Sequence, residues 1–382
     1  MTNPPMDALF FYGTLRYAPL LGLVLGRMPD LVDATLADHL VSWADGESFP
    51  VIESRAGATA TGVLATGITP EDRARLDHYE GAFAYSLVRV EVETDGGERV
   101  AAEVYLPDAT AWTAGAPWSL GDWVRDWGLL TLEAAAEVMG LYGTEAPESI
   151  AARFGMIRAR AQSRLRTGAW TRPQTVGAGF TRADIALDRV DRPYTRFFAI
   201  EEYSARHRLF GGGLSAPVSR AVFRAADAVT VLPYDPLRDR VLLIEQVRLG
   251  AYAHGDPAPW LLEPVAGIID AGESEEMTAR REALEEAGVQ IGALHPVGRY
   301  YPSPGGVAQV LISYVGIADL PDDLPAIGGL DVEGEDIRSH LVNLDAALGM
   351  LTSGELAVAP LIISVQWLAR HRETLRGGSL TA

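Results

Sequence analysis

The stretch of residues 267–289 constrains this chain more than any other part of the sequence. It predicts a helix that begins near Ser274, a residue type favoured at the N-cap position. At about 100° of rotation per residue, Glu282, Glu285 and Glu286 fall within an arc of roughly 100° on this helix. The helix is therefore expected to present a cluster of negative charge along one side.

The same helical spacing places Met277 and Leu284 nearly opposite the three glutamates, so we expect the helix to bury this apolar side. Like charges three and four residues apart cost a few tenths of a kcal/mol per pair. A hard divalent cation bound by the carboxylate oxygens would reverse the sign of that energy. The cluster is either a metal site or an acidic helix face in solvent, and the spacing alone leaves both open.

The spaced residues of this stretch resemble the Nudix box, G-x5-E-x7-R-E-U-x-E-E-x-G-U, in which U is a bulky apolar residue. The matching residues are Gly267, Glu273, Arg281, Glu282, Glu285, Glu286, Gly288 and Val289, and only Ala283 is smaller than the pattern asks. A chance match over so many spaced positions is rare. The resemblance implies a Mg²⁺-dependent hydrolase acting on a nucleoside diphosphate linked to another group.

The flanking segments narrow the resemblance to the ADP-ribose pyrophosphatase branch of the Nudix hydrolases, from about Arg196 to Arg376. The segments that carry it are 232–236, 243–252 and 259–267 upstream of the helix, and Ser-Pro-Gly-Gly (303–306) and Gly-Glu-Asp-Ile-Arg (334–338) downstream. The resemblance implies an α/β/α sandwich that hydrolyses ADP-ribose to AMP and ribose 5-phosphate. It also implies a homodimer, because the N-terminal part of the Nudix domain exchanges between subunits in this family.

The resemblance assigns roles to residues in and after the box. The expected ligands of Mg²⁺, with Mn²⁺ as the alternative cofactor, are the backbone carbonyl of Ala266 and the side chains of Glu282, Glu285, Glu286 and Glu335. Gly267 permits a close approach of the backbone, and Arg281 is expected to pair with Glu273 in a structural role. Glu333, in the acidic segment 329–336, is the expected general base, although this segment could equally be an acidic surface loop.

Substrate contacts follow from the same resemblance. Phe197 and Phe198 match a family position where paired aromatic residues stack on the adenine, whereas adjacent phenylalanines elsewhere are commonly strand core. The expected substrate-binding residues are Phe197, Phe198, Arg220, Arg248, Ser303, Gly305 and Gln309. Arginine suits this role because its planar guanidinium grips phosphate oxygens in pairs.

Two positions depart from the family. Gln309 stands where glutamate is common, and Ala225 occupies a position that is commonly basic. Glutamine keeps the hydrogen-bonding shape but loses the charge. The preference among ADP-sugars therefore stays open, and an ADP-ribose-binding sensor with weak turnover remains an alternative.

A second motif lies at the start of the chain. The apolar run 9–12 predicts a buried strand, and Gly13–Arg16 follows it directly. Glycine after a strand allows backbone N–H groups to approach a ligand, which predicts an anion-binding turn. Further on, the segment 76–81 precedes an alternating strand at 88–92.

Together with Phe49-Pro50 and Gly62, these segments resemble the γ-glutamylcyclotransferase-like, or AIG2-like, family over about residues 7–110. The resemblance implies a small mixed β-barrel with a cavity in which Glu80 acts as general acid and base. The residues expected to hold the substrate there are Tyr12, Gly13, Thr14 and Leu15. Active members convert a γ-glutamyl amine to 5-oxoproline; the alternatives are a binding module or a domain that only stabilises the dimer.

Between the two motifs the sequence predicts helices over residues 119–167. Leu120, Trp123, Trp127 and Leu130 recur at helical spacing and indicate a core stripe. The segment 149–166 is rich in arginine, at positions 153, 158, 160, 164 and 166, and we expect a solvated or domain-bridging helix rather than an RNA-binding arm. The expected organisation is a mixed α+β chain with a barrel domain at 1–118, a helical connector and linker at 119–190, and a Nudix domain at 191–382.

Composition sets outer limits on the function. The chain has 382 residues, a net charge of −19, no cysteine and no lysine, so all 32 basic residues are arginine. The charge disfavours nucleic-acid binding, and the missing cysteines exclude disulfides and thiol catalysis. We expect a cytoplasmic protein, because we find no apolar run of about 18 residues and no signal peptide. The fusion also resembles a bacterial architecture associated with tellurite resistance, although no residue explains tellurium chemistry.

Overall fold

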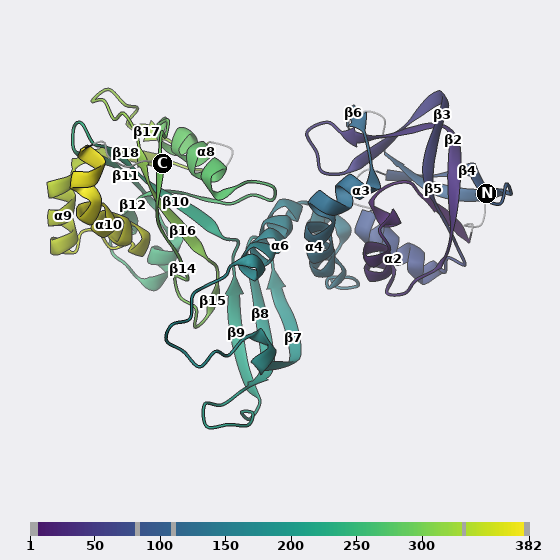
Figure 1. Cartoon of the computed structure of the whole chain (residues 1–382), viewed down its shortest axis with the longest axis horizontal. Coiled ribbons are helices and arrows are strands. Elements are labelled where there is room, and N and C mark those ends of the chain that lie inside the picture. The colour runs from purple at the N-terminus through teal and green to yellow at the C-terminus, as the bar shows by residue number, and fades with distance from the viewer. Residues whose placement is uncertain (1–6, 81–84, 108–111, 331–333, 378–382) are drawn as a thin grey trace. The chain divides into compact units, whose positions relative to one another are not determined.

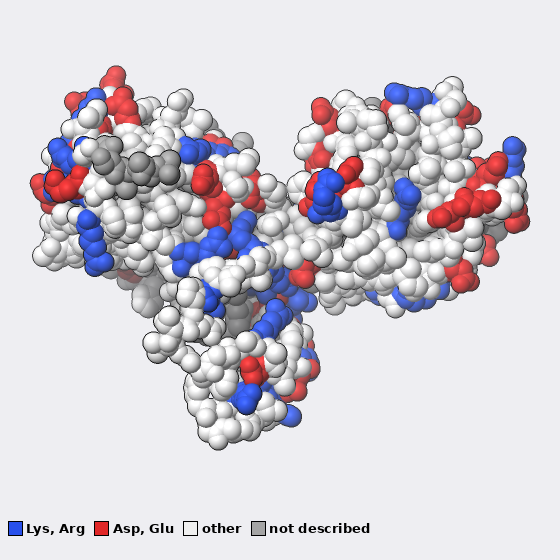
Figure 2. Space-filling view, viewed as in Figure 1, with Lys and Arg blue, Asp and Glu red and all other residues white. Residues whose placement is uncertain are grey.

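The computed structural model describes residues 7–80, 85–107, 112–330 and 334–377 (Figure 1). The chain forms two compact units, Met1–Leu165 and Arg166–Ala382. Figure 2 shows both acidic and basic side chains on each of the two units. None of the helices in the described ranges combines the length and apolar character that a membrane span requires.

A mixed β-barrel forms the centre of the first unit. Its strands are β1 (Ala8–Phe11), β2 (Asp30–Ala44), β3 (Pro50–Thr66), β4 (Tyr85–Thr94), β5 (Arg99–Pro107) and β6 (Ala114–Pro117). The strand order is β3-β1-β5-β4-β2-β6, and a further pairing of β2 with β3 closes the ring. Strand β1 runs parallel to β5, and the other pairs are antiparallel. The predicted mixed barrel is confirmed.

Gly62 belongs to this barrel for a steric reason. A Cβ atom at Gly62 would lie 2.4 Å from the ring of Phe10, which is 1% exposed and packs inside the barrel. Real Cβ atoms do not approach other atoms so closely, so the ring of Phe10 fits only above a glycine. The packing of Phe10 of β1 inside the barrel therefore requires glycine at position 62.

Helices cover the barrel within the first unit. They are α1 (Ala18–Leu25), α2 (Pro70–Glu80), α3 (Leu120–Trp123), a π-helical turn (Val124–Gly128), α4 (Leu129–Met139), α5 (Pro147–Ala151) and the greater part of α6 (Phe154–Ala169). The predicted stripe is confirmed, since Trp123 and Leu130 are buried and Trp123 packs with Leu9 and Leu15. The helices expected as a connector thus pack on the barrel itself.

Helix α6 is more buried than its arginine-rich sequence suggested. Arg160 is fully buried, and its Nη2 lies 2.5 Å from Oε1 of the equally buried Glu137 on α4. Arg153 pairs in the same way with Glu145 at 2.7 Å. The segment was expected to be a solvated or a domain-bridging helix, and the solvated alternative is wrong at these two positions, because Glu137 and Glu145 neutralise the arginines inside the unit.

The second unit contains two sheets. One has the order β15-β9-β8-β7, formed by β7 (Ile185–Thr195), β8 (Ala199–His207), β9 (Val218–Arg224) and β15 (Val307–Ala308). The other has the order β14-β16-β10-β11-β18-β17, formed by β14 (Leu294–Tyr300), β16 (Leu311–Ile317), β10 (Ala228–Asp235), β11 (Arg240–Val247), β18 (Ile337–Asn343) and β17 (Ile327–Gly328). In addition, β12 (Trp260–Glu263) pairs with β11, and β13 (Val265–Ile268) pairs with β10.

Helices lie on both faces of this larger sheet (Figure 1). They are α8 (Glu275–Ala287) on one face, and α9 (Leu344–Ser353) and α10 (Ala359–Arg376) on the other; α7 (Leu249–His254) follows β11. Successive side chains of β10 point to opposite faces of the sheet. Val231 belongs to the same core as Ala279 of α8, and Leu232 belongs to the same core as Leu361 of α10. The predicted α/β/α sandwich is confirmed.

The buried face of α8 differs from the predicted one. Met277 and Leu284 are 57% and 54% exposed, so the expectation that they are buried was wrong. The helix instead buries the small residues Ala279, Ala283 and Ala287. The helix lies close to the sheet, and a Cβ atom at Gly267 of β13 or Gly328 of β17 would overlap atoms of α8.

The buried ion pair between α4 and α6 gives the first prediction. Glu137→Ala leaves the Arg160 charge without its partner, and removing one member of a buried pair costs about 3–5 kcal/mol of unfolding free energy. Urea unfolding of the full chain, followed by tryptophan fluorescence, measures this loss. Glu133→Ala is the matched control on the same helix, because its partly exposed pair with Arg164 is worth less than about 1 kcal/mol. Equal losses in the two variants would contradict the prediction.

Candidate functional site

Helix α8 begins and ends at the residues that the sequence predicts. The Ser274 hydroxyl accepts a hydrogen bond from the backbone N–H of Met277 at 3.2 Å, which caps the first turn. The helix ends at Gly288, whose φ of 63° is the left-handed conformation that glycine tolerates. The positions of the glutamates along the helix are therefore fixed at both ends.

Two glutamates of α8 lie directly on the backbone of β13. A Cβ atom at Gly267 would lie 1.9 Å from Oε1 of Glu282, so the carboxylate occupies the space that any other residue would fill. One helical turn further, Oε2 of Glu286 accepts a hydrogen bond from the backbone N–H of Ala266 at 3.1 Å. The structure thus brings together Ala266, Gly267 and the two carboxylates of the predicted metal site.

Burial gives Glu286 an unusual electrostatic environment. Its residue is 2% exposed, and this burial raises the pKa of Glu286 to about 8. The hydrogen bond from Ala266 opposes the shift, while the negative charges of Glu282 and Glu335 add to it. Burial and the neighbouring carboxylates thus disfavour the ionised form of Glu286, and a cation bound beside it would stabilise that form.

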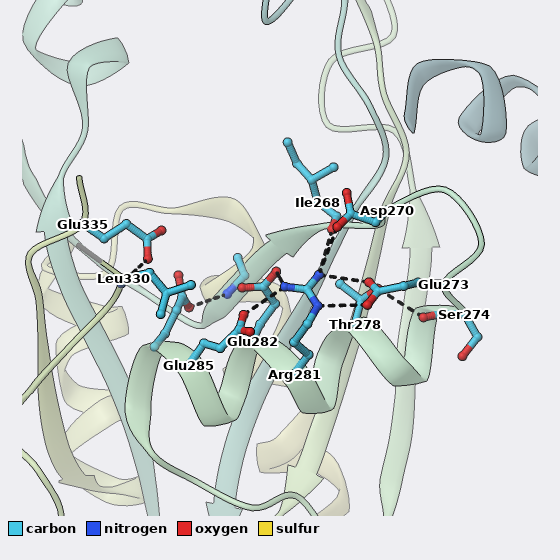
Figure 3. Close-up of polar contacts among 12 residues, drawn as sticks. Ile268, Asp270, Glu273, Ser274, Thr278, Arg281, Glu282, Glu285, Leu330 and Glu335 are labelled. Carbon is cyan, nitrogen blue, oxygen red and sulfur yellow. Dashed lines mark hydrogen bonds and ion pairs between the residues drawn. The ribbon is translucent and has the colours of Figure 1, made fainter. Parts of the chain in front are cut away.

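Arg281 connects the acidic residues of this region (Figure 3). Its Nε and Nη2 donate to the two oxygens of Glu273 at 3.0 and 2.9 Å, so the predicted pairing is present. Its Nη1 donates to Glu282 at 2.7 Å and to Glu285 at 3.0 Å. This arginine fixes the loop before α8 to the helix and holds two of the predicted metal ligands. Within the described residues, no three acidic or histidine side chains are already arranged as a metal site.

The segment after β17 lies against the C-terminal part of α8. A Cβ atom at Gly328 would lie 2.0 Å from the backbone oxygen of Glu286, and the N–H of Gly329 donates to the backbone oxygen of Glu285 at 3.3 Å. Glu335 accepts a hydrogen bond from the N–H of Leu330 at 3.2 Å (Figure 3). Glu335 therefore belongs to the same acidic region, whereas the predicted base Glu333 lies outside the described residues.

The predicted aromatic residues lie at the bend between β7 and β8. Phe197 and Phe198 are 52% and 37% exposed, and their ring centroids are 4.8 Å apart. Phe198 also packs on Phe223 of β9 at 4.6 Å. These exposures do not fit the alternative that both residues are strand core, so an aromatic surface remains available to a ligand.

The two predicted arginines have different environments. Nε of Arg248 donates to Oε2 of Glu263 at 2.7 Å, and Arg248 also lies within electrostatic reach of Glu286. Arg220 lies exposed on β9, where its Nη1 donates to the carbonyl of Ser219 at 2.7 Å, and no described contact joins it to the acidic residues of α8. The sequence analysis did not predict the contact of Arg248 with Glu263. The signal that could have indicated it is that Glu263 is the one acidic residue among the apolar residues of β12.

Gln309 has a clear structural contact. Its Nε2 donates to the backbone carbonyl of Ala226 at 2.8 Å, a bond that an ionised glutamate cannot donate. The preceding turn is closed by the carbonyl of Ser303, which accepts from the N–H groups of Gly306 and Val307. Gly305, within this turn, has open space around its Cα. Glutamine in place of the glutamate that is common in the family therefore fits position 309, because the side chain there donates a hydrogen bond to a carbonyl.

A separate cavity lies within the first unit. It has a volume of about 400 Å³ and brings together all the predicted N-terminal residues, Tyr12, Gly13, Thr14, Leu15 and Glu80. Burial raises the pKa of Glu80 to about 7 and also raises the pKa values of the neighbouring Tyr12, Tyr79 and Tyr85. A carboxyl group with this pKa can both accept and donate a proton near neutral pH.

Comparison with known proteins finds a family match in each unit. The family model described as NUDIX domain matches residues 224–362, and the model described as gamma-glutamyl cyclotransferase, AIG2-like, matches residues 9–125. The ADP-ribose pyrophosphatase of Escherichia coli strain K12 is 40% identical over 205 residues, which cover 54% of this chain and 97% of that protein. The chain belongs to the ADP-ribose pyrophosphatase family of Nudix hydrolases.

Other relatives of this Nudix hydrolase differ in their named substrates. The ADP-ribose pyrophosphatase of Haemophilus influenzae is 35% identical over 201 residues, covering 52% of this chain and 92% of that protein. The GDP-mannose pyrophosphatase of Enterobacter sp. strain 638 is 34% identical over 149 residues, covering 39% of this chain and 76% of that protein. The matches to the ADP-ribose pyrophosphatases are both longer and higher in identity.

The pKa of Glu80 leads to a prediction about pH. A carboxyl whose pKa is about 7 in the folded chain and about 4.3 in the unfolded chain favours folding at low pH and loses that contribution as the pH rises. Glu80→Gln removes the titrating group, so the stability of this variant relative to wild type should increase from pH 5.5 to pH 8. Urea unfolding across this range measures the difference. Glu98→Gln, an exposed acid in the β4–β5 turn, is the control, and a pH-independent offset for Glu80→Gln would contradict the prediction.

Proposed function

We propose that the second unit hydrolyses ADP-ribose to AMP and ribose 5-phosphate. The observation that carries this proposal is the position of Glu282 and Glu286, one helical turn apart and packed on the backbone at Gly267 and Ala266. The similarity to ADP-ribose pyrophosphatases over nearly their whole length supports the choice of substrate. The shorter similarity to GDP-mannose pyrophosphatases leaves other nucleoside diphosphate sugars for the assay to compare.

Mg²⁺ is the proposed cofactor, with Mn²⁺ as the alternative. The donor set fits a hard cation, because it consists of the carboxylates of Glu282, Glu285, Glu286 and Glu335 with the backbone carbonyl of Ala266. The raised pKa of Glu286 and the absence of a side chain at Gly267 support the same fit. Bound Mg²⁺ would neutralise the diphosphate and lower the pKa of a coordinated water.

The protein residues then have separable tasks. Glu282 and Glu286 would hold the cation, while Arg281 keeps the Glu273 loop attached to α8. Glu333 is the proposed base that takes the proton of the attacking water, because it follows the box in the acidic segment that continues to Glu335. The orientation of Glu286 depends on the Ala266 amide, since this bond holds one oxygen in place.

Recognition of the substrate is proposed to come from the remaining predicted residues. The exposed rings of Phe197 and Phe198 would stack on the adenine, a contact worth roughly 1–3 kcal/mol per base. Arg220 and Arg248 would contact phosphate oxygens, and the pair with Glu263 limits the directions open to Arg248. The residues proposed to lie near the terminal ribose are Ser303, Gly305 and Gln309.

We further propose a cytoplasmic homodimer that forms through the second unit. The outer strand β7 exposes the apolar side chains of Ile185, Leu187 and Tyr194, which a partner subunit would cover.

The net charge of −19 supports small-molecule substrates rather than a nucleic acid.

The central test is AMP release from ADP-ribose with Mg²⁺, comparing wild type with Glu286→Gln. Loss of a carboxylate ligand should lower kcat/KM by about a hundredfold or more, because the metal supplies several kcal/mol of charge stabilisation. Chelation should abolish the wild-type rate. Glu276→Gln, an exposed acid on the same helix, should keep the wild-type rate. Folded wild type that releases no nucleoside monophosphate from any of several diphosphate sugars would refute the proposed function.

Gly267→Ala tests the close packing at the site. The added Cβ would overlap Glu282 and force its carboxylate away from β13, so we expect a loss of about tenfold to a hundredfold in kcat/KM. Gly349→Ala is the matched control in the second unit, because nothing lies within 4 Å of its new Cβ atom. The same AMP assay measures both variants. A wild-type rate in Gly267→Ala would show that the position of Glu282 on β13 does not matter for hydrolysis.

A second candidate function is γ-glutamyl cyclotransferase activity in the first unit. The observation that favours it is the position of Glu80 in the same cavity as the Tyr12–Leu15 loop. If the proposal is correct, the protein releases 5-oxoproline from a γ-glutamyl amine, and Glu80→Gln abolishes the release while Glu98→Gln does not. Absence of 5-oxoproline with several γ-glutamyl amines would leave the cavity as a binding site.

A further inference from the structure

The cavity of the first unit is lined partly by residues that lie beyond the AIG2-like family match. The match ends at residue 125, but one side of the cavity is formed by helices that follow it. The lining residues from these helices are Thr131, Ala134 and Val138 of α4, Pro147, Ile150 and Ala151 of α5, and Phe154 and Arg158 of α6. The helical extension therefore forms part of the binding space, and it contributes the arginine of the lining.

Arg158 differs from the other arginines of its helix. Arg153, Arg160 and Arg164 each pair with a glutamate of the first unit. Among the described residues, Arg158 forms no ion pair with a carboxylate; its Nη2 donates to the hydroxyl of Ser48 at 2.8 Å, and its Cζ lies 5.5 Å from the ring centroid of Trp127. A guanidinium group has five N–H donors, so most of the hydrogen-bonding capacity of Arg158 remains for a ligand.

The environment of Arg158 favours an anionic partner. Burial lowers the pKa of Arg158 although Glu47 and Tyr79 oppose this shift, so an anion bound beside the guanidinium would stabilise its charge further. Ser48 and the face of Trp127 hold the guanidinium at the cavity wall, so its direction is set before a ligand arrives. Such an arginine is suited to a paired hydrogen bond with a planar anion.

The rest of the lining indicates what else the ligand carries. Aromatic rings dominate the walls, and they belong to Phe10, Phe11, Tyr12, Phe49, Tyr79, Tyr85, Tyr105, Trp112, Trp123 and Phe154. The acidic residues of the lining are Glu80 and the exposed Glu47, and Tyr79 lies within electrostatic reach of both Glu80 and Arg158. The space of about 400 Å³ is at the small end of ligand pockets. The lining suits a small molecule with an apolar or uncharged body and one anionic group.

We propose that this cavity binds a small monocarboxylate, with Arg158 of the helical extension pairing with the carboxylate and the aromatic wall packing on the body of the ligand. A carboxylate fits better than a phosphate, because the lining has one arginine and two acids, Glu47 and Glu80, and acids in the lining repel a doubly charged group more strongly than a singly charged one. This proposal goes beyond the hydrolysis assigned to the second unit. It concerns binding, so it does not depend on whether Glu80 catalyses a reaction.

Titration calorimetry of the full chain with matched acid and amide pairs tests the proposal. The probes are 5-oxoproline against 5-oxoprolinamide, and benzoate against benzamide, with inorganic phosphate as a further anion. We expect at least one acid to bind wild type about tenfold or more tightly than its amide, because only the carboxylate forms the charge-assisted pair. Phosphate is expected to bind more weakly than that acid.

Variants of Arg158 assign the effect to this residue. Arg158→Gln should abolish the preference for the acid, and Arg158→Lys should keep a reduced preference, because lysine retains the charge but lacks the planar fork. The control is Arg125→Gln, whose exposed side chain does not line the cavity. Circular dichroism and thermal unfolding check that each variant is folded. If Arg158→Gln does not fold, the proposal is tested by the preference for acid over amide in wild type, compared with the same preference in Arg158→Lys.

Four results would overturn the proposal. They are equal binding of acids and amides by wild type, an unchanged preference in folded Arg158→Gln, phosphate binding as tight as the best acid, and no binding of any probe to wild type.

Discussion

Helix α8 lies so close to strand β13 that the carboxylate of Glu282 takes the place of a side chain at Gly267, and Glu286 bonds to the neighbouring amide of Ala266. The same close approach goes with the residues that the helix buries, which are Ala279, Ala283 and Ala287 together with Thr278 and Glu286. It also places two carboxylates in a partly enclosed region where burial raises the pKa of Glu286. The proposed chemistry of the second unit depends on this packing, since the same contact that forms the core positions the proposed metal ligands.

Arg281 has a second role in this arrangement. Like charges along α8 repel one another, and the guanidinium offsets that repulsion by bonding to Glu273, Glu282 and Glu285 together. Binding of a cation by Glu282 and Glu285 would therefore compete with Arg281 for the same oxygens. The bidentate pair with Glu273 is separate from those oxygens, so the loop before α8 can stay attached while the site is loaded.

Much of this site follows from the sequence because its determinants are local. The N-cap at Ser274, the helical arc of the glutamates and the pairing of Arg281 with Glu273 all involve residues within one helix and its entering loop. The predicted burial of Met277 and Leu284 is wrong. Helical periodicity shows which residues share a side of the helix, but it does not show which side faces the sheet or how close the sheet lies. Gln309 illustrates the same limit, since its partner Ala226 lies 83 residues away. Glu137 with Arg160, and Arg158 with Ser48, are likewise contacts between distant segments.

The most direct test of the central claim is the position of the bound cation. Anomalous diffraction from a crystal of the full chain grown with Mn²⁺ measures that position without relying on turnover. The account predicts a peak within about 2.5 Å of carboxylate oxygens of both Glu282 and Glu286, beside the backbone of Ala266. A peak bound by other residues, or none at α8 in crystals that contain Mn²⁺ elsewhere, would contradict the assignment of this helix as the metal site.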